Sequence, residues 1–452
     1  MIAAAIVAFI GLGLPEGGIG VAFPAIRETF DLPVSGVGLL LVPITTGYIV
    51  ESLVNARLTT RLGVGRMLVI AAVASATGAT LYVVGPVMAV LVLGSFFLGI
   101  AAGALDVGLN AYASVHLEHR VLAFMHAGFG VGATLAPFGI SLLLSSGASW
   151  RAAYGCLAVL QVVMGVAWFR LRHSFRVAAP VDPSGGAPGP APAPPADQRR
   201  AMPPHPAHGP PRAAPNATPS VAPQVTSDPD RRDGLVVAFE GDVAEAVADP
   251  SIDDAADGED TPRRVVRRLN VALFFLYTGT EAGTGVLVAT LLRSRGMDEA
   301  TAGLLAALFW GALATGRILV GVLGPRLSPL RALRFAMVGA LLGLLLLWGG
   351  GTGVAGAGLI VVGFSLAPVF PSLVGLTPSR VGARHTAGAL GRQLAAAAIG
   401  VAALPFAIGL IADRLGVQAI APCLFAVGLT FVLLQLLTSH LAGERGSPSE
   451  AV

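Results

Sequence analysis

Two glutamates stand inside long apolar stretches of this sequence, where a charge is costly. Glu16 lies in the segment GLPEGGIGVAF, and Glu281 lies in the similar segment EAGTGV. A carboxylate at the centre of a bilayer costs about 3 kcal/mol on insertion scales, so such residues usually face a cavity inside the protein. Pro15 and the neighbouring glycines would loosen the helix beside Glu16. We expect both glutamates to bind a substrate or protons; the alternative for each is a structural hydrogen bond to a neighbouring helix.

A second polar group is formed by Asp106, Asn110 and His126. Asp106 and Asn110 are four residues apart, which puts them on one face of a helix. His126 lies in the next apolar run, and a rise of about 1.5 Å per residue brings it to nearly the same height as Asp106. A contact between these two side chains would exchange protons near neutral pH, where imidazole titrates. The alternative is a static pair that holds the two helices together. Gln393 is a further candidate for the cavity.

Other charges are more typical of gates or structural ion pairs. Glu51 and Arg317 occupy near-equivalent positions in two apolar runs, and Arg61 and Arg66 belong to the short loop NARLTTRLGVGR. The sequence contains no nucleophile triad, phosphate-binding loop or metal-ligand cluster. We therefore expect no enzyme activity, no cofactor and no metal site.

The composition is that of a membrane protein. The 452 residues are 54% hydrophobic and 12% charged, with a mean hydropathy of +0.75, whereas soluble proteins carry about 25% charged residues. Apolar runs of about 20 residues, long enough to cross a bilayer, recur along both ends of the chain. The excess of basic residues needs no nucleic-acid partner, because cytoplasmic loops of membrane proteins are normally basic.

Six spans are expected in each half of the chain, around a polar middle. The N-terminal bundle is expected over 1–170, and the C-terminal bundle over 268–440. Residues 171–267 include the segment APGPAPAPPADQRRAMPPHPAHGPP, which cannot bury a core and predicts a disordered cytoplasmic linker. A short cytoplasmic tail is expected over 441–452.

Arginine placement predicts the orientation in the membrane. The loops after the second, eighth and tenth spans and both ends of the linker are rich in arginine, and the opposite loops hold few. The positive-inside rule then puts both termini and the linker in the cytoplasm, in the inner membrane of a bacterial cell.

The two halves repeat each other. EGGIGV from Glu16 aligns with EAGTGV from Glu281, and GATLAPFGI from Gly132 aligns with GVAALPFAI from Gly400, at nearly the same offset along the chain. Both pairs fall on equivalent spans. Duplicated bundles of this kind are typical of secondary transporters.

Twelve spans in two repeats with a long central loop resemble the major facilitator superfamily. The loop NARLTTRLGVGR keeps Arg61, Gly63 and Arg66 of that family's signature, with Thr60 at the position of its acid. LDVGLNAY, FMHAGFGVGATLAP and LAPVFPSL are similar to segments of its fucose permease branch. That branch has an acid in the first span where this chain has Gly20, and Glu16 lies one turn earlier on the same face.

The resemblance implies an all-α membrane protein with the major facilitator fold, two pseudo-symmetric six-helix bundles that work by alternating access. It also implies a monomer that takes up a sugar or similar small polar solute together with protons. Two alternatives remain open. One is a proton-antiport exporter of drugs or metabolites, and the other is a non-transporting membrane receptor or scaffold.

Overall fold

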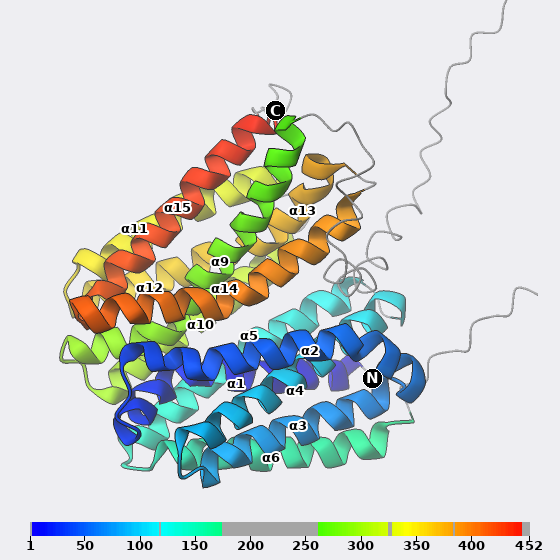
Figure 1. The fold of residues 1–452 in the computed structure, drawn as a ribbon, viewed down its shortest axis with the longest axis vertical. Helices are drawn as coiled ribbons and strands as arrows, with labels where there is room; N and C mark the ends of the chain where they lie inside the picture. Colours follow the sequence, from blue (N-terminus) through cyan, green and yellow to red (C-terminus); the bar gives the residue numbers. More distant parts are fainter. Residues whose placement is uncertain (1, 117–118, 174–260, 324–327, 383–384, 445–452) are drawn as a thin grey trace, which may run out of the picture. The chain divides into compact units, whose positions relative to one another are not determined.

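The protein is described here by a computed structural model that covers residues 2–116, 119–173, 261–323, 328–382 and 385–444. These residues belong to one compact unit, and all their regular elements are helices (Figure 1). Among them, 12 helical spans are long and apolar enough to cross a membrane, which confirms the expected number.

The helices of the first half follow the apolar runs. They are α1 (Ile2–Thr29), the short 3-10 helix η1 (Val34–Val37), α2 (Gly38–Leu62), α3 (Val64–Val84), α4 (Met88–His116), α5 (His119–Ser145) and α6 (Trp150–Leu171). Those of the second half are α9 (Thr261–Ser294), α10 (Glu299–Leu323), α11 (Pro329–Gly349), α12 (Thr352–Leu366), α13 (Val369–Val381), α14 (Thr386–Leu415), η6 (Val417–Ala419) and α15 (Ile420–Leu441).

One span is broken in the middle. α12 ends at Leu366 and α13 begins at Val369, although both belong to a single candidate span. Pro368 has no backbone N–H to continue the helical ladder, and its ring clashes with the preceding turn. The break therefore follows from the proline in the segment LAPVFPSL.

The boundary of the linker differs from the expectation. α9 begins at Thr261, so 261–267 are helical and continue the span. Arg263, Arg264 and Arg267 in this turn are good helix formers, and a helix can extend beyond the bilayer into water. The expected disordered segment otherwise lies mostly in 174–260, outside the described residues.

The two halves pack in the same way. In the first half α1 packs on α5, α2 on α4, and α3 on both α4 and α6. In the second half α9 packs on α14, α10 on α12, and α11 on both α12 and α15. Each pair in one half has its counterpart in the other, which supports the duplication read from the two repeated motifs.

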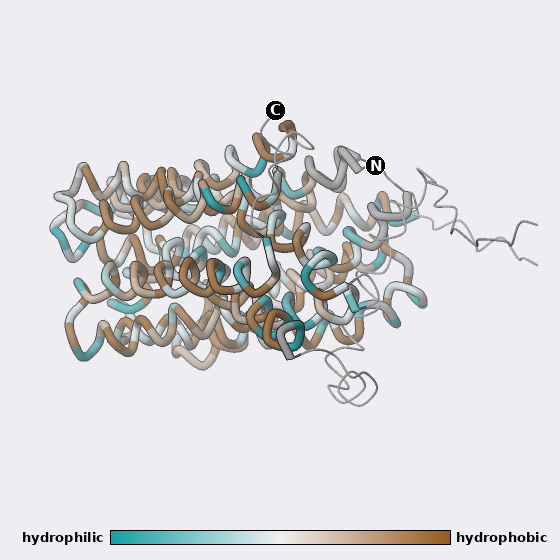
Figure 2. Tube along the Cα trace, turned by 90° about the horizontal axis from the view of Figure 1, so that it is seen from above, coloured by the Kyte–Doolittle hydropathy of each residue, from teal (hydrophilic) through white to brown (hydrophobic). Residues whose placement is uncertain are grey.

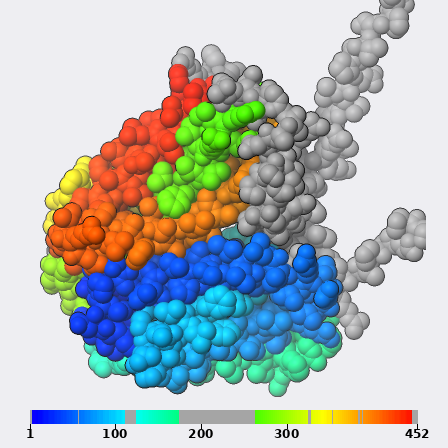
Figure 3. All heavy atoms as spheres, viewed as in Figure 1, coloured from blue at the N-terminus to red at the C-terminus, as the bar shows by residue number. Residues whose placement is uncertain are grey.

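Several helix pairs join the halves, among them η1 with α14 and the following three pairs of long helices. α1 packs on α9, α2 on α14, and α5 on α10; the contact of the N-terminal helices with α14 is visible in Figure 3. Apolar residues run along the helices (Figure 2), and many large ones are exposed, as expected for side chains that face lipid. This framework carries the polar residues of α1, α4, α5 and α9 at membrane depth.

Candidate functional site

Asp106 is held by hydrogen bonds from two helices. The Tyr48 hydroxyl of α2 donates to its Oδ2 at 2.9 Å, and the Asn110 amide of α4 donates to its Oδ1 at 2.9 Å. Asn110 stands one turn beyond Asp106, as the spacing predicted. Both carboxylate oxygens thus have a hydrogen-bond donor.

Glu281 is held by an arginine. The Arg317 guanidinium of α10 donates to both oxygens of Glu281 at 3.1 Å, and the Tyr277 hydroxyl, one turn earlier on α9, also donates to Glu281. Arg317 additionally contacts the Tyr277 oxygen at 3.3 Å. Arg317 therefore forms an ion pair with one of the central carboxylates, which is one of the two roles, gate or structural ion pair, that the sequence had suggested.

Glu16 lies among these groups without a hydrogen-bonding partner. The charges of Glu281, Asp106 and Arg317 all reach its carboxyl group. Glu16 is exposed, while Gly17, Gly18 and the next residues of α1 are buried. Among the described residues no donor contacts Glu16, so it is the least neutralised of the three carboxylates.

His126 is close to this group, but it does not bond to Asp106. Its ring packs edge-on against Phe9 at 5.3 Å, and the charges of Asp106 and Arg317 reach it. The described residues include no hydrogen bond or ion pair between His126 and Asp106. The expected contact is not formed among the described residues, where Tyr48 and Asn110 donate to the Asp106 carboxylate instead.

The remaining candidates form no hydrogen bond or ion pair with these central residues in the described part of the chain. Gln393 is fully buried between α13 and α14, where its Oε1 accepts from Thr377 at 3.1 Å. Glu51 is buried between α2 and α4. Arg61 and Arg66 are exposed at the end of α2 and the start of α3.

Two tyrosines of the site were not among the predicted binding residues. Tyr277 precedes Glu281 by one helical turn, so this spacing could have identified it as a neighbour of the carboxylate. Tyr48 reaches Asp106 from another helix, and the sequence carries no signal for that contact.

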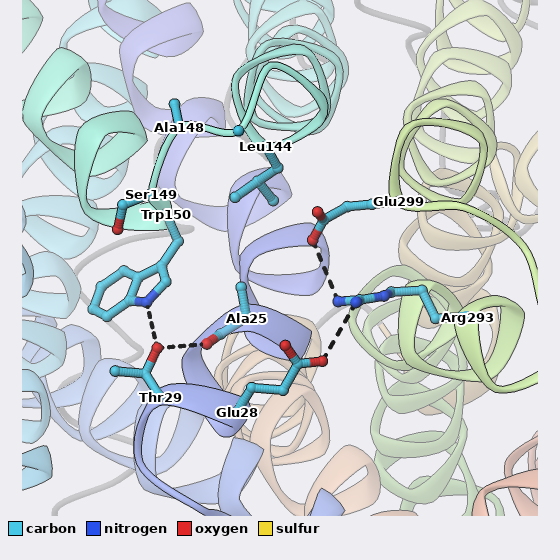
Figure 4. Close-up of a pocket in the computed structure, with 10 residues that line it drawn as sticks. Ala25, Glu28, Thr29, Leu144, Ala148, Ser149, Trp150, Arg293 and Glu299 are labelled. Carbon is cyan, nitrogen blue, oxygen red and sulfur yellow. Dashed lines mark hydrogen bonds and ion pairs between the residues drawn. The ribbon is translucent and has the colours of Figure 1, made fainter.

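A separate cavity of about 470 Å³ opens where α1 and α9 end (Figure 4). Arg293 lies on its wall and bridges Glu28 and Glu299, each at 3.3 Å. The Trp150 indole donates to Thr29 on the opposite wall. This cavity lies at helix ends and contains none of the central carboxylates.

The halves are fastened together at these same helix ends. Asp413 of α14 accepts from the backbone N–H groups of Val34 and Ser35 at 2.6 and 3.1 Å, and the Ser141 hydroxyl of α5 donates to the carbonyl of Ala300 at 2.9 Å. At the opposite ends of the helices, no hydrogen bond or ion pair between the described residues joins the halves. This conformation is closed at the end that carries η1.

Comparison with known sequences points to transporters. Residues 1–220 match the family model for the Major Facilitator Superfamily. The uncharacterized transporter y4wD of Sinorhizobium fredii is 27% identical over 119 residues, which is 26% of this chain and 32% of that protein. The match thus spans about a third of the length of this relative.

Solved transporters share the fold over nearly their whole length. The E. coli fucose:proton symporter FucP has a TM-score of 0.53 at 16% identity, covering 96% of this chain and 98% of that one. The nucleoside transporter NupG has a TM-score of 0.65 at 11% identity, covering 97% and 98%. The human organic anion transporter MFSD10 has a TM-score of 0.60 at 16% identity, covering 97% and 99%.

Identities this low establish the fold alone, so the similarity to FucP does not assign the chain to a branch. The family is that of transporters rather than enzymes, in agreement with the expectation from the sequence. The match to the Major Facilitator Superfamily model over residues 1–220, the 12 candidate spans and the fold shared with solved transporters are the features that this chain has in common with that superfamily.

Proposed function

We propose that the protein is a secondary transporter that works by alternating access and couples the uptake of a small polyhydroxylated solute, such as a sugar, to protons. The observation that carries this proposal is the central group of three carboxylates, Glu16, Asp106 and Glu281, with one arginine, Arg317. One cation cannot neutralise three acids at membrane depth. The surplus negative charge is best balanced by protons that bind to the carboxylates, and this binding would couple solute transport to proton movement.

The same surplus favours a solute that donates hydrogen bonds. Ionised carboxylates only accept hydrogen bonds, and the hydroxyl groups of a sugar or nucleoside can donate to them. The names of the structural neighbours include a fucose:proton symporter, a nucleoside transporter and an organic anion transporter. An anionic solute would meet like charges here, so a neutral polyol suits the site better.

Glu16 is the central residue of the coupling proposal. Asp106 and Glu281 each have donors on both oxygens, whereas Glu16 has none among the described residues. We infer that Glu16 exchanges protons with water that reaches it, and that the charge of Asp106 acts on Glu16 through space. His126, within reach of the Asp106 charge, completes the titratable groups on the N-terminal side.

Orientation and organisation form part of the same proposal. The arginine-rich loops place both termini in the cytoplasm of a bacterial cell, and the end closed by Asp413 then faces outward. The chain would act as a monomer. The segment 171–260 would serve as a tether between the bundles.

Uptake by proteoliposomes tests this function. Labelled fucose, a nucleoside and an organic cation would be offered with and without an imposed proton gradient. We expect gradient-driven accumulation of a neutral polyol, lost in Glu16→Gln and Asp106→Asn while solute counterflow is retained. Asp31→Asn is the matched control, because Asp31 is exposed outside the spans and asparagine tolerates its positive φ of 49°.

Other outcomes would identify the alternatives. Proton-driven export of the organic cation would support an antiporter, since a surplus of carboxylates also suits a cationic solute. Absence of any solute movement, with the protein correctly inserted, would favour a receptor or scaffold.

A further inference from the structure

A buried carboxyl group that the proposed mechanism does not use lies beside the central site. Glu51 of α2 is only 4% exposed. Its side chain faces α4 at Gly103, where an added Cβ would come 2.8 Å from the Glu51 Oε2 atom. Because Gly103 has no side chain, there is space at this point of α4 for the Glu51 carboxyl group.

Only one of the two carboxyl oxygens of Glu51 has a hydrogen-bonding partner among the described residues. Oε1 accepts from the Asn55 amide at 2.7 Å, and the Asn55 carbonyl oxygen in turn accepts from the Thr59 hydroxyl at 3.0 Å. Oε2 is buried and has no hydrogen-bonding partner among the described residues. No described cation forms an ion pair with Glu51.

In these surroundings the charged form of the Glu51 carboxyl group is disfavoured relative to the protonated form. Taking an ionised carboxyl group out of water is costly unless it is paired or fully hydrogen-bonded, and otherwise the group takes up a proton. From this geometry we propose that Glu51 is a second proton-binding site of the transporter, occupied in the conformation described here.

The site is built into the same helix pair as Asp106. On α4, Gly103 faces Glu51 and stands one turn before Asp106. On α2, Tyr48 donates to Asp106 and stands one turn before Glu51. Asp106 and Tyr48 are therefore the titratable residues one turn away from Gly103 and Glu51 in the α2–α4 contact.

α14 also packs on α2, and the Thr45 hydroxyl donates to the Ala398 carbonyl at 3.5 Å. Arg392 stands six residues before Ala398, as Glu51 stands six residues after Thr45, so Arg392 is the charged residue of α14 nearest in register to Glu51.

Glu51 and Asp106 lie on the two helices of the same contact, so a movement there changes the surroundings of both carboxyl groups. Movement of α2 against α4 that brings water to Glu51 would release its proton. The proposal rests on proton coupling as the function, and it adds one proton to the cycle.

Infrared difference spectroscopy of the reconstituted protein, recorded between acidic and alkaline buffer, tests the site without any transport. The C=O stretch of a protonated carboxyl group gives a separate band. We expect Glu51→Gln to remove one such band, and Asp106→Asn to leave that band in place. Ser52→Ala, on the next residue of the same helix, is the control that should keep the whole spectrum. A Glu51→Gln spectrum identical to that of the unaltered protein would overturn the proposal.

Transport measurements separate a titrating role from a structural one. Glutamine keeps the bond from Asn55 but cannot release a proton, so Glu51→Gln should lose accumulation against a gradient and keep counterflow. Glu51→Asp should restore part of the accumulation. If Glu51→Gln accumulates solute with an unchanged pH profile, Glu51 is not a coupling site, even though the protein remains a proton-coupled transporter. If the unaltered protein shows no proton dependence, the proposed function fails, and the infrared band alone still decides whether Glu51 holds a proton.

Discussion

At the scale of single residues, the sequence identifies which side chains are unusual but not how they pair. The spacing of Asp106 and Asn110 correctly placed them on one face, because neighbours within a helix follow from its period. The pairing of Glu281 with Arg317, and of Asp106 with Tyr48, joins different helices. Such contacts depend on how helices rotate and cross, and a single sequence holds no measure of that.

The ion pair between Arg317 and Glu281 gives a prediction at this scale. The side chains of Arg317 and Glu281 are 24% and 14% exposed, and removing one partner leaves a largely buried charge alone, which costs about 3–5 kcal/mol in fully buried pairs. Arg317→Gln should therefore lower the thermal stability in detergent and abolish transport. The double variant Arg317→Gln with Glu281→Gln should recover most of the stability without transport. A double variant as unstable as Arg317→Gln would show that the arginine acts by packing.

At the scale of helices, the glycines of the two repeated motifs differ in what an added Cβ atom would meet. An added Cβ on Gly20 would meet the backbone of Gly285 and the Val286 Cα at 2.9 Å, whereas one on Gly18 would meet the mobile end of Ile140. Gly20 and Gly285 occupy equivalent places in EGGIG and EAGTG. The repeat was visible in the sequence, but the choice between adjacent glycines required the crossing of α1 and α9.

Gly20→Ala should therefore disturb the contact of α1 with α9. The backbone of Gly285 cannot turn away as a side chain would, and overpacking of this kind costs about 1–3 kcal/mol. We expect lower transport and a shift away from the conformation described here. Gly139→Ala in α5 is the control, because an added Cβ there meets nothing within 4 Å. Equal effects of the two substitutions on uptake would contradict the assignment of this crossing.

The segment after α15 fastens the ends of three helices. The expected tail begins by folding back, so that Glu444 binds the buried Arg380 of α13 through its two oxygens at 2.8 and 3.0 Å. Arg380 also donates to Asn270 of α9 at 2.8 Å and contacts Gln435 of α15. A sequence that ends in polar residues gives no indication of this contact.

A dependence of stability on pH follows from Glu444. Burial alone would raise the pKa of its carboxyl group, but the hydrogen bonds and charge of Arg380 outweigh burial, and the pKa lies below its usual value. A lowered pKa in the folded state means that the contribution is complete above the unfolded pKa and is lost as the pH falls through the folded pKa. Thermal unfolding should show Glu444→Gln less stable than the unaltered protein at neutral pH, with the difference disappearing in acid. A difference that stays constant down to low pH would exclude this carboxylate as the cause.

At the scale of the whole molecule, the 12 spans and the duplication were predictable because apolar length and repeated motifs are properties of the sequence. The conformational state was not. The hydrogen bonds and ion pairs of Asp413, Arg293 and Ser141 join the halves at the end that carries η1, and a further bond, from Thr45 to the Ala398 carbonyl, lies nearer the middle of the helices. An alternating-access transporter needs both a closed and an open form of each end, and one sequence encodes both.

The Asp413 contact offers the most direct control over that balance. Its carboxylate accepts from two backbone N–H groups of the opposite half, at Val34 and Ser35. Removing both bonds with Asp413→Ala should disfavour this closed end by about 1–2 kcal/mol, which changes the ratio of the two states by roughly 5- to 30-fold. Spin labels at Ser146→Cys and Ser294→Cys, in a protein without Cys156 and Cys423, would report the separation of the two ends by pulsed dipolar spectroscopy. We expect a larger population of long distances in Asp413→Ala, and none in the control Arg414→Ala, whose exposed side chain is adjacent in sequence. Distance distributions that coincide in the two variants would mean that the closed end is held by Arg293 and Ser141 without help from Asp413.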